Sequence, residues 1–304
     1  MSYASLHILG LGNIGGGLFE WALKNEITGK PDNYLRISSV TNSKFILLNP
    51  TPHAAVSSLK SLLKNGPAVG KVDRKIFDPE QFIDEQLVSE AKKSNIDAIF
   101  IADCSSSNSL PEQFYQKFLE VSPKIKIITP NKKSVSNNYQ LFQELYSNYH
   151  LTQNRFNFET TVCAGLPAIQ MIENLVLSNH KIIEIQGMFS GTLNYVLSTF
   201  MNSDDENLKM SDVVHNAWKQ GLTEPNPIDD LSGTDVARKI LILSRICGNK
   251  MELGDIELKG LVDFQAETAD IYFEKMKELD DYFGQLKSEV KVGDLKKQKK
   301  IMEY

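Results

Sequence analysis

Short apolar runs alternate with longer amphipathic stretches through the first half of the chain. Such runs predict strands, and the stretches between them predict helices, one of which Asp78 would cap with Pro79 in its first turn. The predicted strands are residues 6–9, 35–40, 96–102 and 125–128, and the predicted helices include residues 13–23 and 111–121. This order is typical of a doubly wound parallel sheet in an α/β domain.

The pattern changes near Arg155. Residues 156–162 alternate like a strand, and an apolar helix is predicted to end near residue 177. A further strand is predicted at residues 182–188, followed by more helices. We therefore expect two domains, residues 1–154 with the doubly wound sheet and residues 155–304 with an α+β arrangement.

A loop rich in acids precedes an apolar helix at residues 221–239. Two prolines, Pro225 and Pro227, exclude a helix from the first half, and Ser232 is a plausible N-cap for a helix that runs to about Cys247. So apolar a helix should be largely buried, and charged side chains are rarely buried unless they are paired or functional. The stretch is therefore a candidate functional site.

On that helix Asp235 and Lys239 are four residues apart and so share one face. An ordinary surface salt bridge would have the same spacing, and by base rate it is the commoner outcome. The predicted burial of the helix favours a functional acid–amine pair instead.

Three glycines, Gly10, Gly12 and Gly15, have the G-x-G-x-x-G spacing between the first predicted strand and helix. This spacing permits a tight turn and lets the backbone approach a pyrophosphate at the helix N-terminus, where Asn13 and Ile14 lie. Glycines alone mean little, but the strand–turn–helix context favours a dinucleotide-binding domain of the Rossmann type.

The next strand lacks the acid that would hold the ribose of NAD, because no Asp or Glu occurs from residue 33 to residue 72. The loop at residues 41–44 carries hydroxyls, an amide and Lys44 instead. These groups suit the 2′-phosphate of NADP better than a bare ribose, although NAD stays possible. An unremarkable polar turn is about equally plausible for any single residue of the loop.

Two further predicted strands end in polar segments. The strand at 96–102 leads to hydroxyls that include Ser105 and Ser106, and the strand at 125–128 leads to Lys132. Ligands of open α/β sheets bind at the carboxyl ends of the strands. Lys132 could be a solvated surface lysine, or it could face the nicotinamide and a carbonyl substrate.

Composition narrows the class of protein. The chain has 304 residues, of which 41% are hydrophobic and 23% charged, and a net charge of −5. That balance gives no basic footprint for nucleic acid, and no apolar run is long enough for a bilayer. No secretory signal precedes the first strand, and the three separated cysteines are expected to be free thiols of a reducing cytoplasm. Scattered histidines argue against a transition-metal site.

Together these motifs resemble homoserine dehydrogenase. The resemblance rests on five segments in order, residues 10–15, 129–132, 159–167, 189–195 and 221–239. It implies a monofunctional, NAD(P)-dependent oxidoreductase that interconverts L-homoserine and L-aspartate 4-semialdehyde, in threonine and methionine biosynthesis. It also implies a Rossmann domain and a substrate domain whose sheet builds a homodimer.

The resemblance also implies roles for the candidate residues. Lys239, assisted by Asp235, would donate the proton that the developing alkoxide needs, and Lys132 would stabilise the reacting oxygen. The carboxylates would bind the α-ammonium group of the amino-acid substrate. They are Glu224 and Asp235, with Asp229 and Asp230 in support.

A monovalent cation such as sodium is implied at residues 159–166. Its oxygen ligands would be largely backbone carbonyls, of Glu159, Val162, Ala164 and Leu166. Cys163 stands where the family usually has glycine, which would cost stability if a positive φ is needed there.

The chain also ends at Tyr304, where family members are expected to continue. Three hypotheses therefore stay open. An active homoserine dehydrogenase is favoured by the complete set of candidate residues. The alternatives are an impaired homologue that keeps a binding or regulatory role, and a different NAD(P)-dependent amino-acid or aldehyde dehydrogenase.

Overall fold

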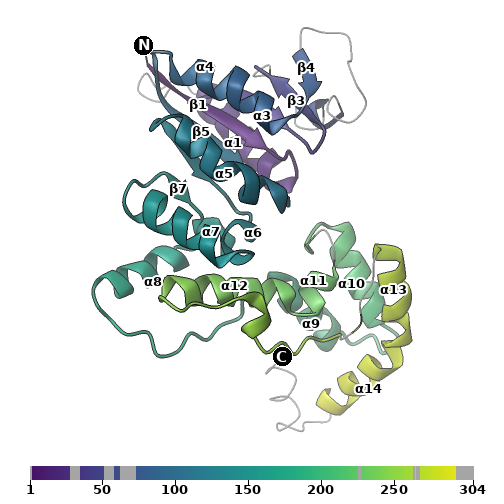
Figure 1. The fold of residues 1–304 in the computed structure, drawn as a ribbon. Coiled ribbons are helices and arrows are strands. Elements are labelled where there is room, and N and C mark those ends of the chain that lie inside the picture. The colour runs from purple at the N-terminus through teal and green to yellow at the C-terminus, as the bar shows by residue number, and fades with distance from the viewer. Residues whose placement is uncertain are drawn as a thin grey trace. The chain divides into compact units, whose positions relative to one another are not determined.

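The computed structural model describes residues 2–27, 35–50, 58–61, 73–224, 227–262, 264 and 268–291. The chain forms two compact units, Met1–Met171 and Ile172–Tyr304 (Figure 1). We predicted the domain boundary near Arg155, and the structure divides later. The reason is that strand β7 (Phe156–Asn157) pairs in parallel with strand β6 (Ile125–Ile128) and so belongs to the first unit.

The first unit contains a mixed sheet whose centre is parallel. In the described part of the chain the strand order is β4-β3-β2-β1-β5-β6-β7. Strand β1 (Tyr3–Leu9) pairs in parallel with both β2 (Leu35–Thr41) and β5 (Ile96–Asp103), and β5 pairs in parallel with β6. The predicted α/β class and its parallel strands are confirmed. The strand order reverses beside β1, which makes that edge the expected ligand site of such a sheet.

Two antiparallel strands extend the sheet at one edge. Strand β3 (Phe45–Leu48) pairs with β2, and β4 (Asp73–Ile76) pairs with β3. The sequence pattern predicted neither strand, because both are only four residues long. The sheet is therefore largely, not wholly, parallel.

Helices connect the strands of the first unit. As predicted, Asp78 caps α3, and its carboxylate accepts a hydrogen bond from the Gln81 N–H at 2.9 Å. Strand β7 is shorter than predicted, because a 3₁₀ turn replaces its second half. The helical segments are α1 (Asn13–Ile27), α3 (Pro79–Phe82), η1 (Ile83–Leu87), α4 (Val88–Ala91), α5 (Ser109–Val121), α6 (Lys133–Ser136), α7 (Tyr139–Glu144), η2 (Leu145–Leu151) and η3 (Glu159–Thr161). Helix α8 (Ala168–Leu177) then crosses the boundary between the units.

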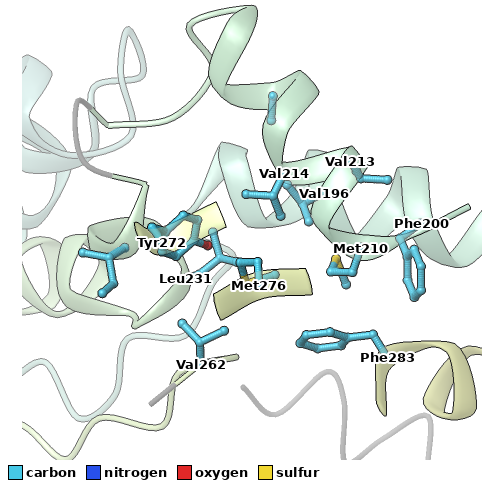
Figure 2. Close-up of a cluster of buried hydrophobic side chains, with 12 residues drawn as sticks. Val196, Phe200, Met210, Val213, Val214, Leu231, Val262, Tyr272, Met276 and Phe283 are labelled. Atoms are coloured by element: carbon cyan, nitrogen blue, oxygen red, sulfur yellow. The ribbon is translucent and has the colours of Figure 1, made fainter. Parts of the chain in front are cut away.

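The second unit is helical in its described part. Its core joins side chains from the first helices of the unit to Tyr272, Met276 and Phe283 near its end (Figure 2). Burying such apolar side chains stabilises the unit. The helical segments are α9 (Gly191–Asn202), α10 (Met210–Lys219), α11 (Ile228–Leu231), α12 (Thr234–Ile246), η4 (Leu253–Asp255), α13 (Ala269–Glu278) and α14 (Asp280–Lys291).

Two predictions for this unit were wrong. Residues 182–188 form no strand, because a strand needs a hydrogen-bonded neighbour and none of the described residues pairs with them. Ser232 is not the N-cap of α12. The one-turn helix α11 ends there, and Gly233 caps α12 with a left-handed φ of 82°. Pro225 and Asn226 lie outside the described residues, so the expected break at Pro225 is untested.

Candidate functional site

The glycine turn, residues 10–15, lies between β1 and α1. Gly10 has a φ of 96°, and a Cβ there would come within 2.9 Å of the Ser105 backbone. A Cβ on Gly15 would come within 2.1 Å of the Gly10 carbonyl oxygen. Gly12 meets nothing within 4 Å and is exposed beside Asn13 and Ile14 at the start of α1. Steric contacts therefore require glycine at positions 10 and 15. Gly12 is not required in this way, and it leaves the approach to the N-terminus of α1 open.

The loop after β2 is attached to the glycine turn. The Gly10 and Leu11 N–H groups both donate to the Thr41 carbonyl oxygen, at 3.1 and 2.9 Å. The Asn42 side-chain oxygen accepts from the backbone N–H groups of Lys44 and Phe45. Asn42 therefore shapes the loop, and the Lys44 side chain is exposed to solvent at its tip.

Two turns meet at the carboxyl edge of the sheet. We call residues 104–107 the serine turn and residues 129–133 the lysine turn. The Ser105 N–H donates to an Asp103 carboxylate oxygen at 2.9 Å, and the Lys133 ammonium donates to the Ser106 carbonyl oxygen at 2.9 Å. Lys132 is half-buried at the N-cap of α6. The predicted residues Ser105, Ser106 and Lys132 thus lie on two turns that contact each other.

A buried polar network underlies both turns and was not predicted. It comprises Asp103, Tyr115, Thr129 and Asn131, which are all 5% exposed or less. Burial raises the pKa of the Asp103 carboxyl, while hydrogen bonds from Ser105, Tyr115 and Asn131 act in the opposite direction. A carboxylate at the end of a buried strand was the signal in the sequence that could have revealed it.

The second unit holds a cluster of acids around one amine, which we call the acid–lysine cluster: Glu224, Asp230, Asp235 and Lys239. As predicted, Asp235 and Lys239 share a face of α12, and their charged atoms are 2.6 Å apart. The Asp235 side chain is 4% exposed and that of Lys239 15% exposed, so the pair is no ordinary surface salt bridge. The Lys239 ammonium also donates to the Phe189 carbonyl oxygen at 2.7 Å.

Asp230 links the acidic loop to this pair. Its carboxylate accepts the Glu224 N–H at 2.7 Å, and it is 2% exposed. Its pKa is raised to about 6, chiefly by burial and also by the charges of Asp235 and Glu224, while hydrogen bonds from the Glu224 N–H and Thr192 act in the opposite direction. Asp229 is half-buried beside it on α11. Buried carboxylates that raise one another's pKa favour a bound cation, because a positive charge would relieve their mutual repulsion.

The turn at residues 159–166 has an unusual backbone. Cys163 and Ala164 both have left-handed conformations, with φ of 60° and 52°. The Glu159 carboxylate accepts from the Ile169 and Gln170 N–H groups at the start of α8, at 2.9 and 3.0 Å. The Leu166 carbonyl oxygen accepts from the Ala168 N–H at 2.8 Å. Cys163 therefore has the positive φ at which a cysteine costs stability, whereas the ligand set of Glu159, Val162, Ala164 and Leu166 stays a prediction.

The described residues contain neither a cluster of metal ligands nor a membrane-spanning helix. Among them, no three His, Cys, Asp or Glu side chains are grouped as metal ligands would be. None of the helices in those ranges combines the length and apolar character needed to cross a membrane.

The comparisons with known proteins agree with this description. A family model for homoserine dehydrogenase matches residues 167–303. The chain is 32% identical over 295 residues to a bifunctional aspartokinase/homoserine dehydrogenase of Buchnera aphidicola, covering 95% of this chain and 34% of that protein. It is 37% identical over 209 residues to homoserine dehydrogenase of Saccharomyces cerevisiae, covering 67% of this chain and 57% of the yeast protein.

A hyperthermophilic archaeal homoserine dehydrogenase, solved in complex with NADPH, has a similar fold. Its TM-score is 0.57 at 20% identity, over 81% of this chain and 70% of that one. Fold and glycine turn define an α/β protein of the dinucleotide-binding class. More narrowly, the chain belongs to the homoserine dehydrogenase family, a family of NAD(P)-dependent oxidoreductases. It spans about a third of the length of the bifunctional relatives.

Proposed function

We propose that the protein interconverts L-homoserine and L-aspartate 4-semialdehyde, with NADP or NAD as the second substrate, in the cytoplasm. The reaction would serve threonine and methionine biosynthesis. The observation that carries the proposal is the buried Asp235–Lys239 pair, 2.6 Å apart and grouped with the carboxylates of Glu224 and Asp230. Reduction of an aldehyde needs a hydride and a proton, and Lys239 can supply the proton.

Hydrogen-bond geometry supports this role for Lys239. An ammonium group has three N–H donors. One is directed at Asp235 and one at the Phe189 carbonyl oxygen, which fixes the side chain and leaves a third donor for the reacting oxygen. The Asp235 carboxylate holds the amine in place, so the pair acts as one acid–base unit.

The remaining carboxylates suit the α-ammonium group of the substrate. Glu224 and Asp230 are joined through the Glu224 N–H, so the acidic loop and α11 hold both groups near Asp235. Ionised carboxylates form strong charge-assisted hydrogen bonds with an ammonium group. Asp229 would support this arrangement from the same helix. Recognition of an amino acid, as opposed to a simple aldehyde, follows from this excess of negative charge.

The first unit suits the dinucleotide. Gly12 leaves open the approach to the N-terminus of α1, where a pyrophosphate would bind. Ser105, Ser106 and Lys132 occupy the carboxyl edge of the sheet, and Lys44 would meet a 2′-phosphate. A bound nicotinamide supplies or accepts the hydride. Lys132 would then stabilise negative charge on the reacting oxygen.

Two further proposals concern a cation and a second subunit. Carbonyl oxygens of Glu159, Val162, Ala164 and Leu166 would bind a monovalent cation such as sodium, since hard cations prefer oxygen ligands.

Residues 182–188 would pair with a second copy of the chain in a homodimer. This pairing would cover Ile183 and Met188, which are 92% and 68% exposed in the single chain. Analytical ultracentrifugation of the wild type and an Ile183→Glu variant would test the dimer.

An assay of the purified chain tests the function. We expect reduction of NADP that depends on L-homoserine, and oxidation of NADPH that depends on aspartate 4-semialdehyde. Binding of NADPH without turnover would instead indicate an impaired homologue. Turnover of another amino acid, with none of homoserine, would indicate a different dehydrogenase. Replacing sodium by choline in the same assay tests the cation.

A further inference from the structure

Three segments of the first unit meet at one buried carboxylate. Asp103 ends β5, Tyr115 lies on α5, and Thr129 and Asn131 belong to the lysine turn after β6. The Tyr115 hydroxyl donates to an Asp103 carboxylate oxygen at 2.6 Å, and the Asn131 amide donates to the same oxygen at 3.3 Å. The other oxygen accepts the Ser105 N–H. One side chain therefore bonds to both turns at the edge of the sheet.

The backbone of the lysine turn is tied to the same group. The Thr129 hydroxyl donates to the Asp103 carbonyl oxygen at 2.9 Å and accepts the Asn131 N–H at 2.9 Å. The Asn131 amide also donates to the Ser107 carbonyl oxygen at 2.8 Å, which joins the lysine turn directly to the serine turn. Since these groups are buried, water cannot replace a lost partner, and each bond restrains the turns strongly.

Tyr115 is suited to be a permanent donor in this network. Burial, and then the Asp103 charge, raise the pKa of its hydroxyl well above the usual value, so it keeps its proton at any working pH. Its ring is fully buried and packs against Phe156 at 5.9 Å between centroids. The aromatic body therefore belongs to the core, and only the hydroxyl contributes to the network.

We propose that Asp103 and Tyr115 are positioning residues that lock the serine turn to the lysine turn and thereby hold Lys132 in its reactive orientation. The proposal rests on the proposed function for what Lys132 does, but the locking of the two turns is independent of it. Lys132 follows Asn131 directly, so a shift of that residue moves the lysine. A displacement of about 1 Å in a reacting group can cost roughly 100-fold in rate.

Four substitutions in the full chain separate positioning from folding. Tyr115→Phe and Thr129→Val each remove one hydroxyl and keep the shape of the side chain. Thr129→Ser restores the hydroxyl and is the conservative rescue. Phe118→Leu is the matched control, because Phe118 is buried one turn further along α5 and lies outside the network. It should lower the unfolding temperature without touching either turn.

Three measurements are made on each variant: thermal unfolding, steady-state kinetics with homoserine, and hydrogen exchange of peptides covering the two turns. For Tyr115→Phe and Thr129→Val we expect kcat to fall roughly 10- to 100-fold with KM nearly unchanged. We also expect exchange to accelerate roughly tenfold in both turns. Thr129→Ser should stay within about threefold of the wild type in both readouts.

The control decides between the two roles. Phe118→Leu should leave kcat and the exchange of both turns near the wild-type values. The proposal is overturned if Phe118→Leu loses as much kcat as the hydroxyl variants do. It is also overturned if exchange in those variants becomes faster in only one of the two turns. If the wild type does not turn over homoserine, the proposed function fails and hydrogen exchange alone decides the locking of the turns. If the wild type is active and the hydroxyl variants match it, the locking fails and the proposed function stands.

Discussion

The sheet edge of the first unit and the acid–lysine cluster of the second unit are held by different forces. At the sheet edge, contacts of Gly10 and Gly15 with backbone atoms fix the turns, and neutral donors surround the Asp103 carboxylate. In the acid–lysine cluster, three carboxylates and one ammonium group lie close together with little solvent. Steric contacts and hydrogen bonds therefore determine the geometry of the sheet edge, whereas charge–charge interactions dominate the acid–lysine cluster.

This difference predicts how each region tolerates change. A region held by sterics and hydrogen bonds loses its geometry when a single atom is added or removed. A region of buried charge can gain stability when a charge is removed, and then loses binding or catalysis instead. Substitutions that keep the size of a side chain therefore separate the two regions most clearly.

The largest effect is expected at the amine of the cluster. Lys239→Ala should lower kcat by roughly 100- to 10,000-fold, the usual contribution of a general acid–base group. Binding of NADPH should be nearly unchanged, since the glycine turn is intact. Steady-state kinetics and a fluorescence titration with NADPH measure the two quantities. Lys219→Ala, an exposed lysine of α10, is the control. Near-normal turnover of Lys239→Ala would remove Lys239 from the mechanism.

A smaller effect, of a different kind, is expected at the acidic loop. Glu224→Gln keeps the size of the side chain and removes its charge, so the contact to the substrate ammonium weakens. We expect KM for homoserine to rise by ~10- to 150-fold with little change in kcat. Glu257→Gln, at an exposed acid of the same unit, should leave KM unchanged. An unchanged KM in Glu224→Gln would make Glu224 a structural residue.

The sequence predicted the elements of these regions better than their connections. Helical spacing alone places Asp235 and Lys239 together, and the strand–turn–helix pattern around Gly10 is local. The Asp103 network was missed because Tyr115 lies on another element, and only tertiary packing brings the two together. Within one chain, residues 182–188 do not form the predicted strand for the same reason, since alternation of side chains does not supply a pairing partner.

Asp230 should make the stability of the folded chain depend on pH. Burial raises its pKa from 3.8 to about 6, so the folded state holds a proton that the unfolded chain releases. Its contribution to stability is therefore complete below pH ~4 and is lost as the pH rises through ~6. At pH 7 the folded chain must carry a buried, ionised Asp230 carboxylate, which costs stability. Asp230→Asn removes that charge and should raise the free energy of unfolding at pH 7 by ~1–3 kcal/mol.

The same Asp230→Asn variant should show almost no gain at pH 4, where the wild-type carboxyl is mostly protonated when folded. Urea unfolding at both pH values measures the difference. Homoserine should bind the variant more weakly, because one carboxylate of the cluster is neutral. A loss of stability at pH 7 would show that the Asp230 charge is compensated in the folded chain, and would contradict the assignment of the cluster as a region of unrelieved charge.

A moderate effect is expected at the exposed tip of the loop after β2. Lys44→Glu should weaken NADPH relative to NADH, because it replaces attraction at the 2′-phosphate by repulsion. One exposed charged contact is worth ~1–2 kcal/mol, so the preference should move by roughly 5- to 30-fold. Lys24→Glu, an exposed lysine in the last turn of α1, makes the same change of charge elsewhere. Calorimetric titration with both cofactors decides, and an equal change in the two affinities would exclude phosphate recognition by this loop.

The smallest effect tests whether the first unit also stores backbone strain. Cys163 has a φ of 60°, a conformation that costs a residue with a Cβ about 1–2 kcal/mol, and glycine adopts it freely. Glycine also makes the unfolded chain more flexible, which offsets part of the gain. Cys163→Gly should therefore stabilise the protein by a net ~0.5–1 kcal/mol in urea unfolding. Cys163→Ala is the matched control, because it removes the thiol and keeps the Cβ, and it should bring no such gain. Equal stability of the two variants would mean that the turn relaxes around its side chain, and that its left-handed backbone carries no strain that glycine can relieve.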